Sequence, residues 1–384
     1  MFDKISLKKS LFVILLIILF ISCSSNEYPM DIKYENGIKV VNNPDFPKLK
    51  TKEVKQKELL SIGEEEGEKE YNFFRISDIN IDGKGNIYVV DWSEREVRVF
   101  DKDGNFVKTI GRSGQGPGEF SEPSRIFINS ENIIYVFDSQ NGLRVTRFSS
   151  GYEYIDHKTF GFGKVLIGID NEDDLFLTNR LDWEYYTGKE KRSFERLDQN
   201  GEIISTLVTL EGQNGTPVPD GGLWRTGYEH GAINYALKSN GDLIAGSSDK
   251  YIFSVYDKFG NLKMKFGREY EPIPVTDADR NKLSKDQKRK KIIPSKKPAF
   301  RISYYRFLID NENNFWVLTF EKESEGITFD VFDEEGVYIQ KAFFKFNNFK
   351  LNPILFDDGI LYAIHIDENG VNRVKGYKLD YLFQ

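Results

Sequence analysis

Residues that could carry chemistry are most concentrated in one glycine-rich stretch. Residues 110–126 read IGRSGQGPGEFSEPSRI and hold four glycines and two prolines. A phosphate-binding loop must follow a buried strand and precede a helix whose N-terminus faces the anion. The residues that follow, SRIFINSENIIYVFD, alternate as a strand does and show no helical period. This stretch is therefore interpreted as a connection between sheets.

Metal binding and nucleophilic catalysis have little support in the sequence. The acidic turns DGKGN, DKDGN, DNEDD and DNENN lack the twelve-residue spacing of a calcium loop, and turn chemistry explains them. The three histidines, His157, His230 and His365, are not at metal-ligand spacing. There is one cysteine, Cys23, and no G-x-S-x-G motif. We expect no metal and no cofactor, although paired carboxylates remain an open possibility among 60 Asp and Glu residues.

Aromatic and arginine residues gather in four long segments that interrupt the strand pattern: residues 91–96, 179–192, 211–231 and 268–301. Tryptophan, tyrosine and arginine are the types enriched in recognition sites. The alternative is that these aromatics pack as lids over the ends of the sheets. The candidate ligand-binding residues are Trp92, Arg95, Arg112, Gln115, Trp183, Tyr185, Tyr186, Trp224, Arg225, Tyr228 and His230.

The elements that would position these segments come from an internal repeat. Residues 76–111 contain four alternating apolar runs, at 76–81, 87–90, 97–100 and 106–110, separated by turn residues. The second run recurs as NIYVVD, IIYVFD, DLFLTN, DLIAGS, NFWVLT and ILYAIH, which makes six copies. The intervals widen before Leu243 and Phe315, where insertions near 211–231 and 268–301 must lie. Four antiparallel strands per unit of this length predict an all-β, six-bladed β-propeller over residues 54–384.

Ring closure is a sharper prediction. The sixth unit ends at Gln384 after its third strand, so the chain supplies no fourth strand there. Residues 54–76 have the same form as an outer strand followed by a crossing loop. We therefore expect Gln56–Ile62 to complete the last blade, and truncation of either end to unfold the domain.

The run GNIYVVDWSEREVRVFDKDGNFVKTIGRSGQGPGEFSEP resembles the NHL-type repeat and the related bacterial family of secreted or lipoprotein six-bladed β-propellers. It departs from the NHL pattern at Glu94, where asparagine is usual. The resemblance implies the fold and a secreted or lipid-anchored bacterial protein. It implies no single reaction, because propellers host many unrelated functions.

The N-terminal residues indicate export. Lys4, Lys8 and Lys9 precede an apolar run, Leu11–Ile21, that is shorter than the about 20 residues needed to span a bilayer. Ser22-Cys23 follows, which resembles a bacterial lipobox despite Phe20 in place of the usual leucine. We expect residues 1–22 to be a lipoprotein signal peptide, Cys23 the lipidated residue, and residues 23–53 a tether and lead-in. An ordinary secretory signal and an uncleaved anchor are the alternatives, and Ser24 favours the outer membrane.

The formal net charge of −7 leaves no basic stripe for nucleic acid. The expected function is thus a monomeric, envelope-anchored binding or scaffold module that recognises a protein or carbohydrate ligand through its loop face. The alternative is a hydrolase or lyase with carboxylates, and possible calcium, at the channel mouth. The enzyme hypothesis requires polar side chains from at least three blades to converge at the axis. The binding hypothesis requires Trp92, Trp183 and Trp224 to be accessible.

Overall fold

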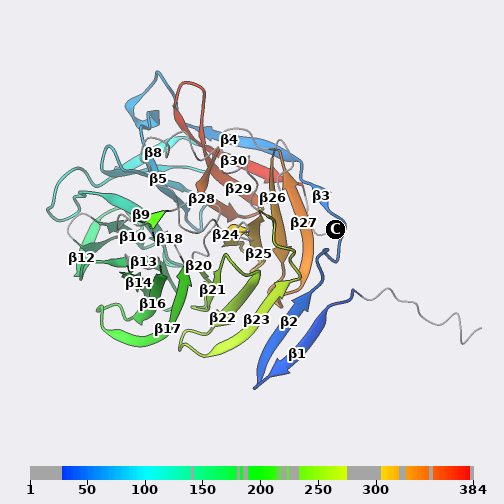
Figure 1. Cartoon of the computed structure of the whole chain (residues 1–384). Coiled ribbons are helices and arrows are strands. Elements are labelled where there is room, and N and C mark those ends of the chain that lie inside the picture. The colour runs from blue at the N-terminus through cyan, green and yellow to red at the C-terminus, as the bar shows by residue number, and fades with distance from the viewer. Residues whose placement is uncertain are drawn as a thin grey trace, which may run out of the picture.

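The computed structural model describes residues 28–139, 142–179, 182–184, 189–213, 216–217, 223–224, 233–274, 304–319, 326–345 and 349–380. Apart from the short 3-10 helix η1 (Lys69–Tyr71), the regular structure in these ranges is β-strand. No helix within them is long and apolar enough to cross a membrane. Six antiparallel sheets follow one another around a common centre (Figure 1). The predicted six-bladed propeller is confirmed.

Each blade has four strands from the inner to the outer edge, and in the first five blades these strands follow one another in chain order. Blade one is β5 (Ile76–Ile81), β6 (Ile87–Asp91), β7 (Glu96–Phe100) and β8 (Phe106–Ile110). Blade two is β9 (Pro123–Ile128), β10 (Ile134–Asp138), β11 (Leu143–Phe148) and β12 (Tyr154–Phe160). Blade three is β13 (Lys164–Ile169), β14 (Leu175–Asn179), β16 (Lys189–Leu197) and β17 (Ile203–Gln213), and β15 (Asp182–Glu184) also pairs with β16.

The second half of the ring continues the same order. Blade four is β20 (Ile233–Leu237), β21 (Leu243–Ser247), β22 (Ile252–Tyr256) and β23 (Leu262–Arg268). Blade five is β24 (Tyr304–Ile309), β25 (Phe315–Thr319), β26 (Ile327–Phe332) and β27 (Tyr338–Phe344). Blade six is β28 (Phe349–Asp357), β29 (Ile360–Ile366), β30 (Asn372–Leu379) and β4 (Gln56–Ile62). A separate pair, β18 (Thr216–Pro217) and β19 (Leu223–Trp224), falls in the expected insertion near 211–231.

Aspartates at the hairpins explain the acidic turns. The Asp82 side chain accepts hydrogen bonds from the backbone N–H groups of Lys84 and Asn86, both at 2.9 Å. Gly85 adopts a φ of 83°, which favours glycine. The same carboxylate-to-backbone pattern recurs at Asp101, Asp170, Asp198, Asp257, Asp310, Asp333 and Asp367. These aspartates therefore fix the turns, as the sequence predicts.

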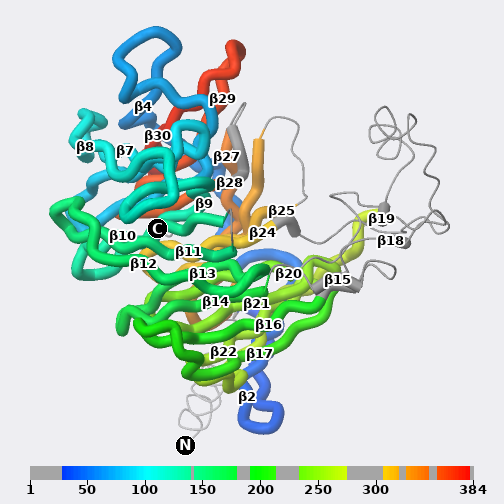
Figure 2. The backbone as a smooth tube through the Cα atoms, turned by 90° about the vertical axis from the view of Figure 1, so that its left-hand side faces the viewer, coloured from blue at the N-terminus to red at the C-terminus, as the bar shows by residue number. Residues whose placement is uncertain are grey.

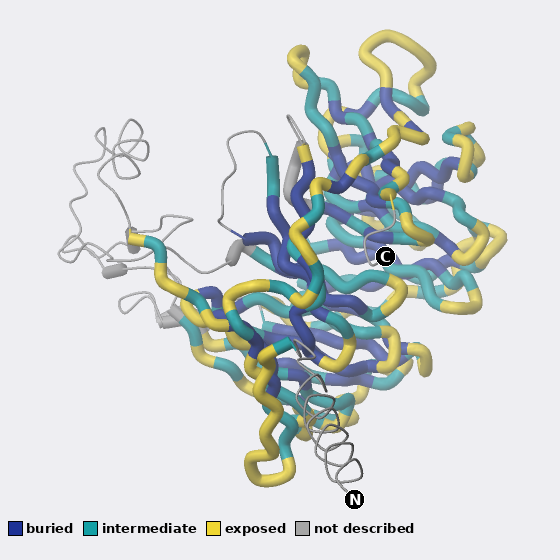
Figure 3. Tube along the Cα trace, turned by 90° about the vertical axis from the view of Figure 1, so that its right-hand side faces the viewer, coloured by how far each residue is buried: buried dark blue, intermediate teal, exposed yellow. Residues whose placement is uncertain are grey.

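Apolar side chains fill the spaces between neighbouring blades. The buried residues of the described chain form six clusters, and each cluster joins two adjacent blades. Figure 3 shows the buried residues within the sheets and the exposed residues mainly at their turns. Because each blade shares a cluster with both neighbours, the blades stabilise one another around the ring.

The ring closes through β4, the predicted segment Gln56–Ile62. It pairs antiparallel with β30, and Ile62 lies opposite Val374. Leu60 and Ile62 are 9% and 1% exposed, and they join the cluster that connects blade six to blade one. The last blade thus combines strands from the two ends of the described chain.

The expected lead-in carries three further strands. Strands β1 (Asp31–Glu35) and β2 (Ile38–Asn43) form a hairpin, and β2 pairs parallel with β23 at the outer edge of blade four. Strand β3 (Lys52–Glu53) pairs parallel with β27 of blade five. The hairpin lies at the lower edge in Figure 2. We call residues 31–62 the N-terminal belt, because they add strands to blades four, five and six in turn.

Asn43 fixes the belt at the junction of blades four and five. It is 1% exposed. Its side-chain amide donates to the carbonyl oxygens of Gly267 and Gly336, at 2.8 and 2.9 Å, and accepts from the backbone N–H of Tyr338 at 2.9 Å. These three hydrogen bonds are made by a buried amide, and a shift of β2 along β23 by one residue would break them. They therefore fix the register of the N-terminal belt on blade four.

Candidate functional site

The glycine-rich stretch is a crossing loop from β8 to β9. Phe120 is fully buried between blades one and two, and a Cβ atom on Gly111 would lie 2.2 Å from its ring. The Glu119 carboxylate accepts from the backbone N–H of Gly116 at 2.9 Å and pairs with Arg112, which lowers the pKa of Glu119. In a phosphate-binding loop, such backbone N–H groups donate to the anion. Here the Gly116 N–H already donates to Glu119. The connection interpretation is correct.

Arginines fasten the crossing loops to the blades that follow them. Arg144 on β11 donates to the carbonyl oxygens of Gln115 and Glu119, at 3.1 and 2.6 Å, and pairs with Asp138 at 2.7 Å. Arg98 on β7 donates to the carbonyl oxygen of Asn72 at 2.6 Å, in the loop that precedes blade one. Its side chain is 1% exposed. The aspartate at the end of the second strand and the arginine of the third strand therefore have a structural role in blades one and two.

One hydrogen bond joins two of the predicted loops of the ring. Arg95 donates to the Ser113 hydroxyl at 2.8 Å, which joins the β6–β7 turn to the β8–β9 loop. Trp92 is half-buried, and the Arg75 guanidinium lies 4.2 Å from its ring centroid. Arg112 has an 80% exposed side chain. We call this side of the ring, where second-to-third-strand turns and crossing loops lie, the loop face.

The remaining predicted site residues, or their side chains, lie outside the described part of the chain. Trp183 and Trp224 lie in β15 and β19, but their side chains fall outside the described part. Tyr185, Tyr186, Arg225, Tyr228 and His230 lie outside the described residues, as do Cys23 and most of residues 268–301. For Trp183 and Trp224, accessibility therefore stays a prediction.

The two described histidines each contact a tyrosine. His157 Nδ1 lies 2.8 Å from the Tyr154 hydroxyl, and His365 Nε2 lies 3.0 Å from the Tyr377 hydroxyl. Burial lowers the pKa of His365 to about 4, so its imidazole is neutral at physiological pH.

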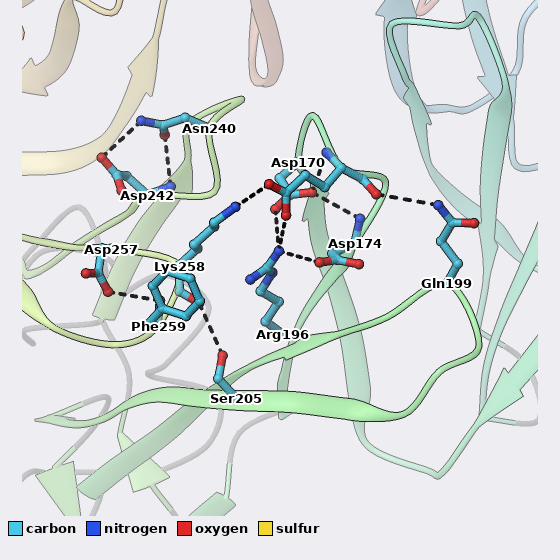
Figure 4. A network of polar contacts seen from close by, with 11 residues as sticks. Asp170, Asp174, Arg196, Gln199, Ser205, Asn240, Asp242, Asp257, Lys258 and Phe259 are labelled. Carbon is cyan, nitrogen blue, oxygen red and sulfur yellow. Dashed lines mark hydrogen bonds and ion pairs between the residues drawn. The ribbon is translucent and has the colours of Figure 1, made fainter.

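One acidic group in the described residues has the spacing of a metal site. Oxygen atoms of Asp170, Glu172 and Asp174 lie within 4.8 Å of one another. Arg196 occupies the space between them, and its Nη2 lies 2.6 Å from Glu172 and 3.5 Å from Asp170 and also pairs with Asp174 (Figure 4). Lys258, from the β22–β23 turn, pairs with Glu172. This group is an ion-pair network that joins blades three and four.

The inner strands of four blades carry polar residues at one shared register position. Each of these residues pairs with the fourth residue of the next strand: Asp78 with Val90, Arg125 with Phe137, Asn234 with Gly246 and Arg306 with Leu318. Blade three has Val165 at this position, opposite Thr178. Inner strands surround the central channel of a propeller. We call Asp78, Arg125 and Arg306 the charged belt.

The charges of Arg125 and Arg306 act on Asp78, and Asp78 and Arg125 each form a hydrogen bond with the backbone. Asp78 accepts from the backbone N–H of Ile126 at 3.0 Å, and Arg125 donates to the carbonyl oxygen of Leu166 at 3.3 Å. Burial raises the pKa of Asp78 to about 6, although the Ile126 N–H and Arg125 oppose this shift. Burial and the Arg125 charge lower the pKa of Arg306, while Asp78 opposes that change. The belt therefore combines charged groups from blades one, two and five.

A hollow of about 240 Å³ opens beside the charged belt, between blades two and three. Ser124, which precedes Arg125, and Val165 both line it. Phe162, in the short β12–β13 crossing loop, also lines it and is 84% exposed. Ser124 Oγ is buried without a hydrogen-bond partner. Apolar surface, hydroxyl groups and nearby positive charge meet at this point of the loop face.

Neither the charged belt nor this hollow was predicted from the sequence. Long aromatic loops drew attention, whereas Phe162 lies in a three-residue connection, GFG. The charged belt had a visible signal, because ISDINI, SRIFI and YYRFLI carry Asp, Arg and Arg at one aligned position. Only alignment of the inner strands would have shown it.

Comparisons with known proteins agree with this architecture. A family model described as a 6-bladed beta-propeller, DUF5128, matches residues 50–350, so the chain belongs to this family. No curated protein matches.

Two solved structures show the same fold at low identity. A protein of Bacteroides fragilis NCTC 9343 described as exported is 13% identical, with a TM-score of 0.55 over 89% of this chain and 100% of its own. A DUF4221 family member from Bacteroides vulgatus is 12% identical, with a TM-score of 0.54 over 86% of this chain and 99% of its own.

Proposed function

We propose that this chain is an exported, lipid-anchored binding module of the bacterial envelope that recognises a protein or glycan ligand through its loop face. The observation that carries the proposal is the hollow of about 240 Å³ beside the charged belt, with the exposed Phe162 at its edge. An aromatic residue that is 84% exposed has no role in the core, and such residues are typical anchors of recognition sites.

The chemistry of the site favours a ligand with an apolar or sugar-ring face and a carboxylate. Phe162 and Phe137 offer aromatic surface in the hollow. Arg125 follows Ser124 directly along β9, and its positive charge contributes to the lowered pKa of Arg306. Guanidinium groups recognise carboxylates with directed hydrogen bonds, so they would fix the orientation of such a ligand.

The test is capture of ligands from the native envelope by the full chain, with acidic peptides and uronate-containing glycans as defined probes. Phe162→Ala is expected to weaken capture about tenfold, as loss of an aromatic anchor does. Phe259→Ala is the matched control, since Phe259 is 60% exposed on a hairpin of the opposite face. Trp183→Ala and Trp224→Ala test the predicted aromatic loops. Equal capture by the Phe162 and Phe259 variants would contradict the proposal.

Export and anchoring are proposed from residues 1–23 and supported by the described export of a protein with the same fold. Expression in a bacterial host with a radiolabelled fatty acid should label the wild-type chain but not a Cys23→Ser variant. Label retained in the variant would place any lipid elsewhere, whereas an unlabelled, soluble wild-type chain would favour an ordinary secretory signal.

An enzymatic role is the second candidate, and the charged belt favours it. The charges of Arg125 and Arg306, from two other blades, lower the pKa of Asp78 against the effect of burial, which supports this candidate. A carboxyl group with a pKa of about 6 suits a general acid or base near neutral pH. If captured ligands are turned over by hydrolysis or elimination, Asp78→Asn should abolish turnover and retain binding. Unchanged turnover would remove Asp78 from the chemistry.

A further inference from the structure

A second hollow, of about 100 Å³, lies at the junction of blades five and six. The β24–β25 and β28–β29 turns form its rim, together with the end of β30. Turns from first to second strands lie at the opposite end of a four-stranded meander from the crossing loops. This hollow is therefore on the face opposite the loop face, and it is independent of the proposed site there.

The floor of the hollow is apolar and rigid. Trp316 and Phe356 are stacked with ring centroids 4.6 Å apart at 26°, and Leu379 lies beside them. The Trp316 indole N–H donates to Asp310 at 2.8 Å, so the ring is held by a hydrogen bond as well as by packing. A preformed floor of this kind accepts an apolar stem without rearrangement.

The rim carries the opposite character. Asp310, Glu312, Asp357, Asp358 and Asp380 all line the hollow, and no lysine or arginine is among its described lining residues. Asp310 holds its own turn, and Asp357 accepts from Asn311 at 2.8 Å. Glu312, Asp358 and Asp380 are exposed at the rim.

Asp380 has partners from the N-terminal belt. It accepts from the backbone N–H of Lys55 at 2.9 Å, and Lys52 lies 3.9 Å away. Glu312 and Asp358 have no such cation among the ion pairs of the described chain. The negative charge at the rim is thus concentrated on the two turns.

We propose that this hollow binds a lysine or arginine side chain of a protein partner. The methylene stem would lie on Trp316, Phe356 and Leu379, and the cationic end would pair with Glu312 and Asp358 at the rim. An aromatic floor does not stabilise a bare metal ion. Both oxygens of Asp310 already accept hydrogen bonds from backbone and side-chain donors. The propeller would then have a docking surface on each face, as a scaffold requires.

The experiment uses the full chain and an acetylated, amidated pentapeptide whose central residue is arginine. Binding is followed by ¹⁹F NMR of the 5-fluorotryptophan-labelled protein, with the Trp316 signal assigned by Trp316→Phe. We expect a shift of this signal with an affinity in the millimolar range, typical of one side chain in a shallow site. A double variant, Glu312→Gln with Asp358→Asn, should weaken binding about tenfold.

The matched control is Glu131→Gln. Glu131 holds the same turn position in blade two and is also exposed, but it lines none of the described hollows. Undiminished binding to the double variant, or equal binding of a citrulline peptide, would overturn the proposal. Binding that appears only after deletion of residues 381–384 would show that the chain fills the hollow itself, which also overturns it. Loss of loop-face capture leaves this test unaffected, because the two faces are separate.

Discussion

Ring closure makes a quantitative prediction about one strand. Ile62 is 1% exposed and packs between blades six and one, whereas Leu59, three residues earlier in β4, is 48% exposed. Ile62→Ala removes buried apolar atoms and leaves a cavity, so it should lower the free energy of unfolding by about 2–5 kcal/mol. Leu59→Ala removes a similar side chain from the surface and should change it by about 0.5 kcal/mol or less.

The assay is urea denaturation of a purified chain of residues 23–384, followed by tryptophan fluorescence and by far-UV circular dichroism. Coincident transitions in the two probes would show that the ring unfolds as a unit. In the Ile62→Ala variant, backbone hydrogen exchange should be faster in β5 of blade one and in β30 of blade six, since Ile62 joins these two blades. If Ile62→Ala is no more destabilising than Leu59→Ala, β4 does not stabilise the closure and the argument for a shared sixth blade fails.

Three further predictions concern charged groups. Arg196→Met leaves the buried Asp170 and Asp174 without their shared partner and should cost about 3–5 kcal/mol in urea denaturation. Glu172→Gln, which changes a mostly exposed carboxylate, should cost about 1 kcal/mol at most, and equal costs would contradict the network. The raised pKa of Asp78 means that the folded state binds a proton more tightly than the unfolded chain, so stability should fall as pH rises from about 4 to about 6. Asp78→Asn should remove that fall, on the order of 2 kcal/mol, and an unchanged pH profile would refute it. Burial lowers the pKa of His365 in the folded state to about 4, from about 6.5 in the unfolded chain. The stability that its neutral imidazole contributes is therefore fully present above pH 6.5 and is lost as pH falls toward 4. Its imidazole proton signals should titrate near 4 by NMR, and titration near 6.5 would refute the burial argument.

Much of the fold was predictable because the turns are local. The first repeat has strand limits within one residue of those predicted, since Asp82 and Asp101 fix the hairpins through nearby backbone groups. The closing strand was found because an outer strand and crossing loop leave a recognisable pattern. The Asn36-Gly37 turn of the β1–β2 hairpin is also a local signal. Its parallel pairing with β23 depends on contacts made by Asn43 with distant residues, which no local pattern encodes.

The candidate site was less predictable for a physical reason. Trp92 and Arg95 were found because exposed loops show their composition directly. Asp78, Arg125 and Arg306 meet only after the ring has closed, and each lies alone in an apolar strand of its own blade. The hollow near Phe162 depends on how far two blades separate at one end, which is a property of packing and not of sequence pattern.

The N-terminal belt has a consequence for the order of assembly. Strands β2, β3 and β4 are made early, but they add to β23, β27 and β30, which are made much later. During synthesis the N-terminal belt therefore has no sheet to join until β23 has been made, and β4 has none until β30 has been made. Such pairings between distant segments slow folding. A chain organised in this way stays open until its final blade is available, and it then closes in one late step.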